Sequence, residues 1–92
     1  MTEFADRLEQ LRGRFIARSC VERAQLETAL AAADLIEVRR IAHSLSGAGG
    51  TFGFHDISQA AADLEAAVDG GAGEEAVNAT AAPLIALLGA LR

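Results

Sequence analysis

The chain contains no lysine, no tryptophan and no tyrosine, and it has a single cysteine, a single proline and a single methionine. Without lysine it cannot form the Gly-Lys loop with which many nucleotide-binding proteins hold phosphates. One cysteine permits no disulfide within the chain, which fits a reducing compartment. Together with two histidines, this cysteine provides too few ligands for a metal centre. Neither a metal nor another cofactor is therefore expected.

The chain also has few basic residues, and its formal net charge is -5. Nucleic-acid binding needs a concentrated basic patch, whereas Glu9 and Glu22 interrupt the most basic stretch, residues 7–23. No apolar run reaches about 18 residues, so no segment is expected to span a membrane. The acidic N-terminal residues do not resemble a signal peptide. A cytoplasmic protein that binds no nucleic acid is predicted.

Hydrophobic residues make up 51% of the chain, and the abundance of Ala, Leu, Val and Ile favours helices over strands. At 92 residues, the chain is expected to form one domain, residues 1–92. Apolar spacing predicts five helical segments, at residues 2–17, 19–33, 35–52, 56–69 and 74–91. Ser19, Asp34 and Asp56 are the expected N-caps of the middle three. The predicted fold is all-α, an antiparallel four-helix bundle with an additional N-terminal helix.

The third segment places a histidine on the outer face of an amphipathic helix. Its buried stripe contains Leu35, Val38, Ala42, Leu45, Gly49 and Phe52. At about 100° per residue, His43 lies roughly 160° from Leu45 and points away from the core. Its surface neighbours at helical spacing are Arg39, Arg40, Ser46, Gly47 and Gly50.

Three of the residues in this segment are glycines within one turn. Glycine costs a helix about 1 kcal/mol relative to alanine, so its presence needs a reason. Gly49 lies on the buried stripe, where it allows a facing helix to come close. Gly47 and Gly50 lie beside the histidine, where they leave room for a partner protein. A turn from Gly47 to Gly53 is the alternative, but Phe52 continues the helical register past the glycines.

The segment Ala42-His43-Ser44-Leu45-Ser46-Gly47, with Gly53 ten residues after the histidine, resembles histidine-containing phosphotransfer (HPt) domains. Their pattern is Ala-His-x-Leu/Ile-Lys-Gly followed by small residues. The run from Gly50 to Phe54 is similar to the phosphoryl-accepting domain of chemotaxis histidine kinases. Those domains carry a glutamate 22 residues after the histidine, and Glu65 stands there.

The resemblance implies a phosphorelay protein that accepts a phosphoryl group on His43 from a receiver-domain phospho-aspartate or a kinase and passes it to a response regulator. Receiver domains of response regulators or hybrid kinases are the implied partners, and they carry the Mg²⁺. The chain itself would have no ATP site and would not be an enzyme in its own right. It would act as a monomer. Glu65 would hold the Nδ1 proton of His43 and leave Nε2 as the nucleophile.

Two positions depart from the family pattern. The family lysine three residues after the histidine is Ser46, which offers a hydrogen bond to phosphate but no charge. Arg39 and Arg40 are candidates to supply that charge. Chemotaxis kinases have a second histidine near the site, and the corresponding position in this chain is Ala62. Ile36 is a candidate docking contact near the start of the helix.

Two further interpretations remain open. Loss of the lysine is compatible with a docking module that binds and sequesters a receiver domain without phosphoryl transfer. The third interpretation is a structural bundle that self-associates and buries the face of His43. His55, the other histidine, lies in a predicted loop without such a face and is interpreted as a surface or capping residue.

Overall fold

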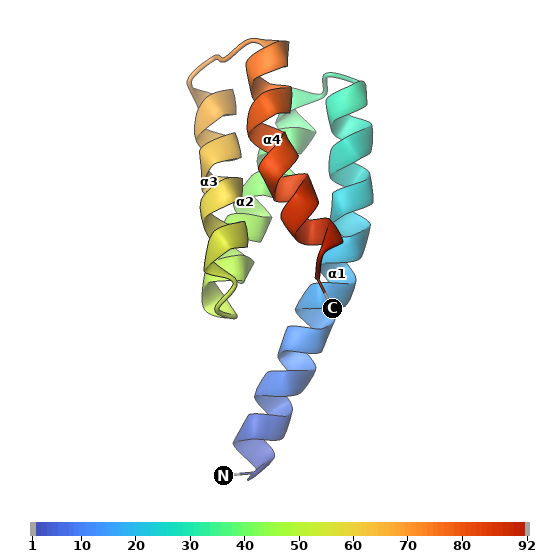
Figure 1. The fold of residues 1–92 in the computed structure, drawn as a ribbon, viewed down its shortest axis with the longest axis vertical. Helices are drawn as coiled ribbons and strands as arrows, with labels where there is room; N and C mark the ends of the chain where they lie inside the picture. Colours follow the sequence, from blue (N-terminus) through green and yellow to red (C-terminus); the bar gives the residue numbers. More distant parts are fainter. Residues whose placement is uncertain (1, 92) are drawn as a thin grey trace.

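The computed structural model describes residues 2–91, which form four helices and no strand. The helices are α1 (Thr2–Ala31), α2 (Leu35–Thr51), α3 (His55–Asp69) and α4 (Glu74–Gly89). Short turns connect them, and consecutive helices run in opposite directions along the long axis of the molecule (Figure 1). The predicted helical fold class is confirmed.

The core lies where the four helices meet, and each helix contributes to it at helical spacing. Its largest fully buried hydrophobic side chains are Leu26, Val38, Ile41, Leu45, Leu64, Val77 and Leu84. On α2, the buried residues Val38, Ala42, Leu45 and Gly49 belong to the predicted stripe, whereas Leu35 at the start of the helix is 39% exposed. The stripe therefore holds α2 in the bundle with the opposite face of the helix free.

The predicted break near Ser19 is wrong, because residues 2–31 form one continuous helix instead of two. Ser19 is fully buried and shares the inner face of α1 with Phe15, Glu22, Leu26 and Ala29. Their spacing of four, three, four and three residues continues a single helical register, and neither glycine nor proline interrupts it after Gly13. A serine without a helix-breaking neighbour is therefore a small interior residue here and not a cap.

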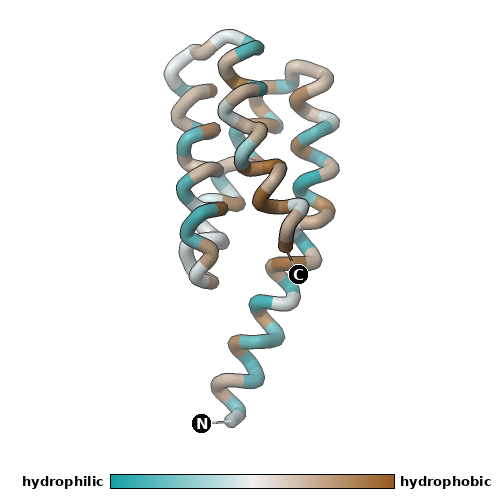
Figure 2. The backbone as a smooth tube through the Cα atoms, in the orientation of Figure 1, coloured by the Kyte–Doolittle hydropathy of each residue, from teal (hydrophilic) through white to brown (hydrophobic). Residues whose placement is uncertain are grey.

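The first half of α1 projects beyond the bundle (Figure 1). Phe4 and Leu8 lie at helical spacing on the same face as the buried Phe15, yet they are 74% and 42% exposed. The other helices are 15 to 17 residues long against 30 for α1, so none of them extends alongside this end. Most of the projecting segment is hydrophilic, with isolated apolar positions (Figure 2). Among residues 2–91 there is thus no separate additional helix, only a long α1.

The helix ends follow the predicted capping in part. Asp34 caps α2, because its side chain accepts a hydrogen bond from the backbone N–H of Glu37. α3 begins at His55, so Asp56 lies in its first turn and is not the N-cap. Pro83 lies inside α4 and does not divide it. Gly53, with φ of +83°, makes the left-handed turn between α2 and α3 that other residues rarely adopt.

Gly49 allows α2 and α3 to approach closely, as predicted from its place on the stripe. A Cβ atom at this position would lie 3.2 Å from the backbone nitrogen of Ser58 and 3.3 Å from the carbonyl oxygen of Phe54. These atoms belong to the first turn of α3 and cannot rotate away as a side chain can. The contact between the two helices depends on the missing side chain.

Arg12 of α1 contacts and stabilises the turn that follows α2. Its Nη1 donates a hydrogen bond of 2.7 Å to the carbonyl oxygen of Phe52, and its guanidinium lies 4.6 Å from the centre of the Phe54 ring. Phe15 of α1 packs against two aromatic side chains of this turn: its ring is stacked on that of Phe54, with centroids 5.1 Å apart, and tilted against that of Phe52, with centroids 5.7 Å apart. The turn is therefore held by both polar and aromatic contacts with α1.

Replacing Arg12 with Met is expected to lower the free energy of unfolding by about 1.5–3 kcal/mol, the usual contribution of a hydrogen bond to a charged group. Methionine keeps most of the side-chain volume but neither donates to Phe52 nor interacts as a cation with Phe54. Urea unfolding followed by circular dichroism measures the change. Arg7→Met, at an exposed position in the first half of α1, is the control and should unfold at the wild-type urea concentration.

Candidate functional site

The exposed face of α2 contains the residues that the sequence places around His43. The His43 side chain is 72% exposed, and Ile36, one heptad earlier, is 87% exposed. Arg40, Gly47 and Gly50 are exposed on the same strip at spacings of three and four residues. A Cβ atom on Gly47 would meet nothing within 4 Å. This exposed strip of α2, from Ile36 to Gly50, is thus an open surface with the His43 imidazole near its middle.

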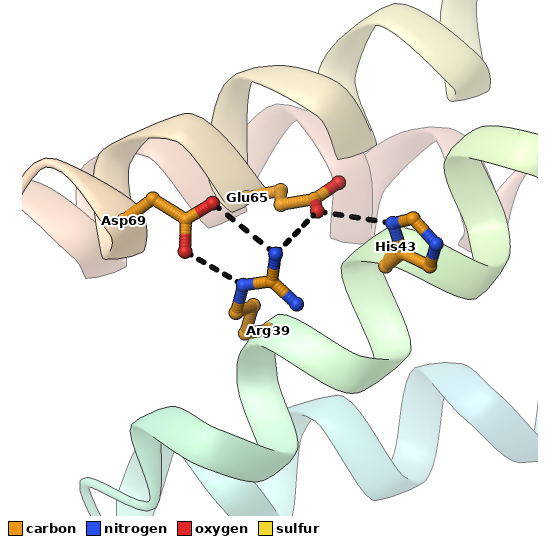
Figure 3. A network of polar contacts seen from close by, with 4 residues as sticks. All are labelled: Arg39, His43, Glu65 and Asp69. Atoms are coloured by element: carbon orange, nitrogen blue, oxygen red, sulfur yellow. Dashed lines mark hydrogen bonds and ion pairs between the residues drawn. The ribbon is translucent and has the colours of Figure 1, made fainter.

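Glu65 of α3 contacts His43 directly. Its Oε2 atom lies 3.0 Å from Nδ1 of the imidazole (Figure 3). The Glu65 side chain is only 19% exposed, so the carboxylate lies in the seam between α2 and α3 while the ring extends outward. When the neutral imidazole donates its Nδ1–H to this carboxylate, Nε2 carries the lone pair and faces away from Glu65.

Arg39 extends this pair into a network of four residues. Its Nη2 lies 3.2 Å from the same Oε2 atom of Glu65, and its Nε lies 2.6 Å from Oδ1 of Asp69. A second contact joins Nη2 to the other Asp69 oxygen at 3.4 Å. The hydrogen bond and the charge of Asp69 raise the pKa of the Arg39 guanidinium above its ordinary value. Arg39 therefore faces two carboxylates of α3.

The contacts between α2 and α3 follow one antiparallel register. From Arg39 through His43 to Gly50, the partners move backward along α3 from Asp69 through Glu65 to Ser58. The hydroxyl of Ser58 donates a 2.7 Å hydrogen bond to the carbonyl oxygen of Ser46. His43 and Glu65 thus belong to a continuous interface and are not an isolated pair.

The other residues expected around the histidine occupy different surroundings. Arg40 forms an ion pair with Glu37 one turn earlier, and the hydrogen bond to that carboxylate raises the pKa of Arg40. Ser46 is half-buried, and its carbonyl is the acceptor for Ser58. Arg18 of α1 reaches Ser44 with an Nη2–Oγ distance of 3.4 Å and pairs with Glu22.

Three contributors were missed by sequence reasoning: Asp69, Ser58 and Arg18. Asp69 stands four residues after Glu65 and Ser58 seven residues before it, so both share its helix face. That spacing was a usable signal once the register between the two helices was assumed. Arg18 carries no comparable signal, because its approach to Ser44 depends on how α1 packs across α2.

No group of three or more metal-ligating side chains occurs among residues 2–91, and none of the described helices is long and apolar enough to cross a membrane. The site contains one exposed imidazole, the Glu65 carboxylate that contacts it, and the ion pairs of Arg39 with Glu65 and Asp69.

Comparison with family models gives a match to the Hpt domain over residues 10–92. The chain belongs to the Hpt domain family. No curated protein and no solved structure gave a match. Hpt domains are phosphotransfer modules that pass phosphoryl groups through a histidine in phosphorelays and interact with receiver domains, without an ATP site of their own. The Hpt match begins within α1 and leaves out residues 2–9 of that helix.

Proposed function

We infer that this Hpt domain accepts a phosphoryl group on Nε2 of His43 from the phospho-aspartate of a receiver domain and transfers it to a response regulator. The observation that carries the inference is the geometry of His43: its ring is exposed, and Nδ1 is engaged by Glu65 while Nε2 faces away from that residue. A nucleophilic imidazole needs one nitrogen with a free lone pair and the other nitrogen protonated.

The transfer step is a direct displacement at phosphorus. The lone pair of Nε2 forms the N–P bond as the bond between phosphorus and the aspartyl oxygen breaks, and the aspartate leaves as a carboxylate. The ring gains positive charge in this step and keeps its proton on Nδ1. The Glu65 carboxylate, 3.0 Å from Nδ1, stabilises that charge. Onward transfer reverses the same bonds with a second receiver.

The domain's share of the catalysis is orientation and docking. Phosphoryl transfer depends mainly on positioning and on stabilisation of charge, and the receiver would supply the Mg²⁺ and most of the latter. Ser46 offers a hydroxyl where the family pattern has lysine, so it contributes no charge. Arg40 is the arginine of the exposed strip, and its pair with Glu37 lies on the surface, where such pairs contribute little and exchange readily.

The face of His43 also fits docking. Ile36 exposes a large apolar side chain in line with the histidine, whereas Gly47 and Gly50 bring a partner near the backbone of α2. Large side chains at an interface centre give most of the binding energy, and small neighbours allow close approach. Donor and acceptor receivers would compete for this one surface.

Incubation with a phosphorylated receiver domain and Mg²⁺ tests the function. The expected result is phosphate on the Hpt domain that is lost in acid and survives alkali, as phosphohistidine does and phosphoserine does not. Binding of a receiver without any label would favour the docking module, which the serine at position 46 motivates. A concentration-dependent dimer that binds no receiver would favour the structural bundle.

Replacing Ile36 with Ser is expected to weaken receiver binding by about tenfold or more, since truncated contacts at interface centres cost more than 1 kcal/mol. The dissociation constant is measured by calorimetry with an unphosphorylated receiver. Phe4→Ser removes a comparably exposed side chain from the projecting end of α1 and serves as the control. If the two variants weaken receiver binding equally, or if neither weakens it, the receiver does not dock around Ile36.

A further inference from the structure

Arg39 occupies a place that its sequence position does not reveal. It stands one turn before His43 on α2, next to Arg40, and both arginines are candidates for a phosphate contact. The structure separates the two. Arg40 pairs within its own helix, whereas the Arg39 guanidinium bridges two carboxylates of α3, one of which contacts the histidine (Figure 3).

Asp69 anchors the bridging guanidinium on the side away from the histidine. Nε and Nη2 of Arg39 face the two Asp69 oxygens in the forked arrangement that fits a carboxylate. The raised pKa of Arg39 has this hydrogen bond as its largest cause. Two of the three guanidinium nitrogens thus face α3, which directs the guanidinium toward Asp69 and Glu65.

Glu65 is the second carboxylate that the Arg39 guanidinium contacts. Its Oε2 atom forms an ion pair with Nη2 of Arg39 at 3.2 Å and lies 3.0 Å from Nδ1 of His43. The carboxylate is negatively charged and each of its oxygens has two lone pairs, so it can accept the Nδ1–H of His43 and form the ion pair with Arg39 at once. Glu65 and Asp69 also lie one turn apart on α3, where two like charges repel each other, and Arg39 lies between them.

We propose that Arg39, anchored by Asp69, is a positioning residue that orients the Glu65 carboxylate and thereby keeps the His43 proton on Nδ1. The consequence for transfer rests on the proposed function. The effect on the histidine tautomer is a property of the isolated domain and stands independently of it.

Removing Arg39 would have two opposing effects on the contact between His43 and Glu65. The carboxylate would lose a competing positive charge, which strengthens its attraction for Nδ1–H. It would also lose the contact that fixes its rotamer. The ring is 72% exposed, and a charge effect in such a solvated place is strongly reduced. Misorientation, in contrast, removes the short hydrogen bond altogether, so the loss of orientation dominates.

Nitrogen-15 NMR of the imidazole rings tests the proposal, because each tautomer gives distinct Nδ1 and Nε2 shifts. At alkaline pH, wild-type His43 is expected to be mainly the Nδ1–H form. Arg39→Gln should convert it to a mixture dominated by Nε2–H, close to the result for Glu65→Ala. His55, the other histidine of the chain, provides an internal reference that should not change.

Two matched variants exclude a general charge effect. Arg40→Gln removes the same charge from the adjacent position and should leave the tautomer of His43 unchanged. Asp69→Asn should shift it in the same direction as Arg39→Gln. The double variant should shift it no further than Arg39→Gln alone, since residues that act through one another are not additive. A wild-type tautomer in Arg39→Gln, or additive shifts in the double variant, would overturn the proposal.

The kinetic measurement links the tautomer to transfer. The rate of phosphorylation by a phosphorylated receiver should fall about tenfold in Arg39→Gln, the lower end of the range found when the outer partner of a metal-binding histidine is removed. The melting temperature should remain near that of the wild type, because an exposed ion pair contributes little. An altered tautomer with an unchanged rate would overturn the role in transfer. Absence of label on the wild type would instead contradict the proposed function, and the NMR result would still decide the positioning.

Discussion

His43→Gln is expected to abolish phosphate uptake from a phosphorylated receiver while leaving the fold intact. The amide of glutamine has no nucleophilic nitrogen lone pair, so the N–P bond cannot form. The side chain replaced is 72% exposed, and such surface changes alter the free energy of unfolding by about 0.5 kcal/mol or less. Acid-labile, alkali-stable label on the domain, measured in parallel with the circular dichroism melting curve, checks both parts.

The second histidine provides the matched control. His55 is exposed at the first position of α3, and His55→Gln should be labelled as fast as the wild type. Ser44, Ser46 and Thr51 lie near His43 on α2, and phosphate on any of these hydroxyls would survive acid. Label that persists in His43→Gln, or that disappears in His55→Gln, would contradict the assignment of the phosphoryl-accepting residue.

The placement of His43 could be predicted from the sequence because it depends on one helix alone. The spacing of Val38, Ala42, Leu45 and Gly49 determines which side of α2 is buried, and the histidine lies opposite. Asp34 as the cap of α2 and Gly49 as the point of close approach are equally local features. Each follows from periodicity, capping or side-chain size within a few residues.

The length of α1 could not be predicted in the same way. Ser19 reads as a cap when its neighbours alone are considered, yet its hydroxyl side chain is buried between helices. Phe4 and Leu8 continue an apolar spacing that elsewhere indicates burial, but no other helix reaches them. Local periodicity shows which face of a helix is apolar. Whether that face is covered depends on the lengths of the other helices.

The partners of Arg39 illustrate an intermediate case. An arginine followed one turn later by a histidine on an exposed face suggests a phosphate contact, and nothing on α2 argues against it. The alternative emerges only from the register with α3. Once Glu65 is placed beside His43, antiparallel packing brings Asp69, four residues after Glu65, toward Arg39, four residues before His43. These two residues form an ion pair.

The same register explains why Gly49 matters beyond the core, and Gly49→Val is expected to destabilise the domain. Its Cβ would lie within 3.2–3.4 Å of backbone atoms of the first turn of α3, and the two γ-methyl groups need further space. Overpacking of this kind costs about 1–3 kcal/mol. For a domain of this size the melting temperature should fall by about 4–8 °C for each kcal/mol.

Gly47→Val is the control that separates packing from the intrinsic preferences of the helix. Both variants place valine in the same turn of α2, but a Cβ at position 47 meets nothing within 4 Å. Its unfolding should therefore remain within about 0.5 kcal/mol of the wild type. If α2 and α3 are forced apart at Gly49, the contact between His43 and Glu65 two turns earlier should loosen as well. The imidazole nitrogen shifts of folded Gly49→Val should then move toward the Nε2–H form, whereas those of Gly47→Val should not. Equal stability of the two valine variants would show that the helices do not depend on this glycine for their approach.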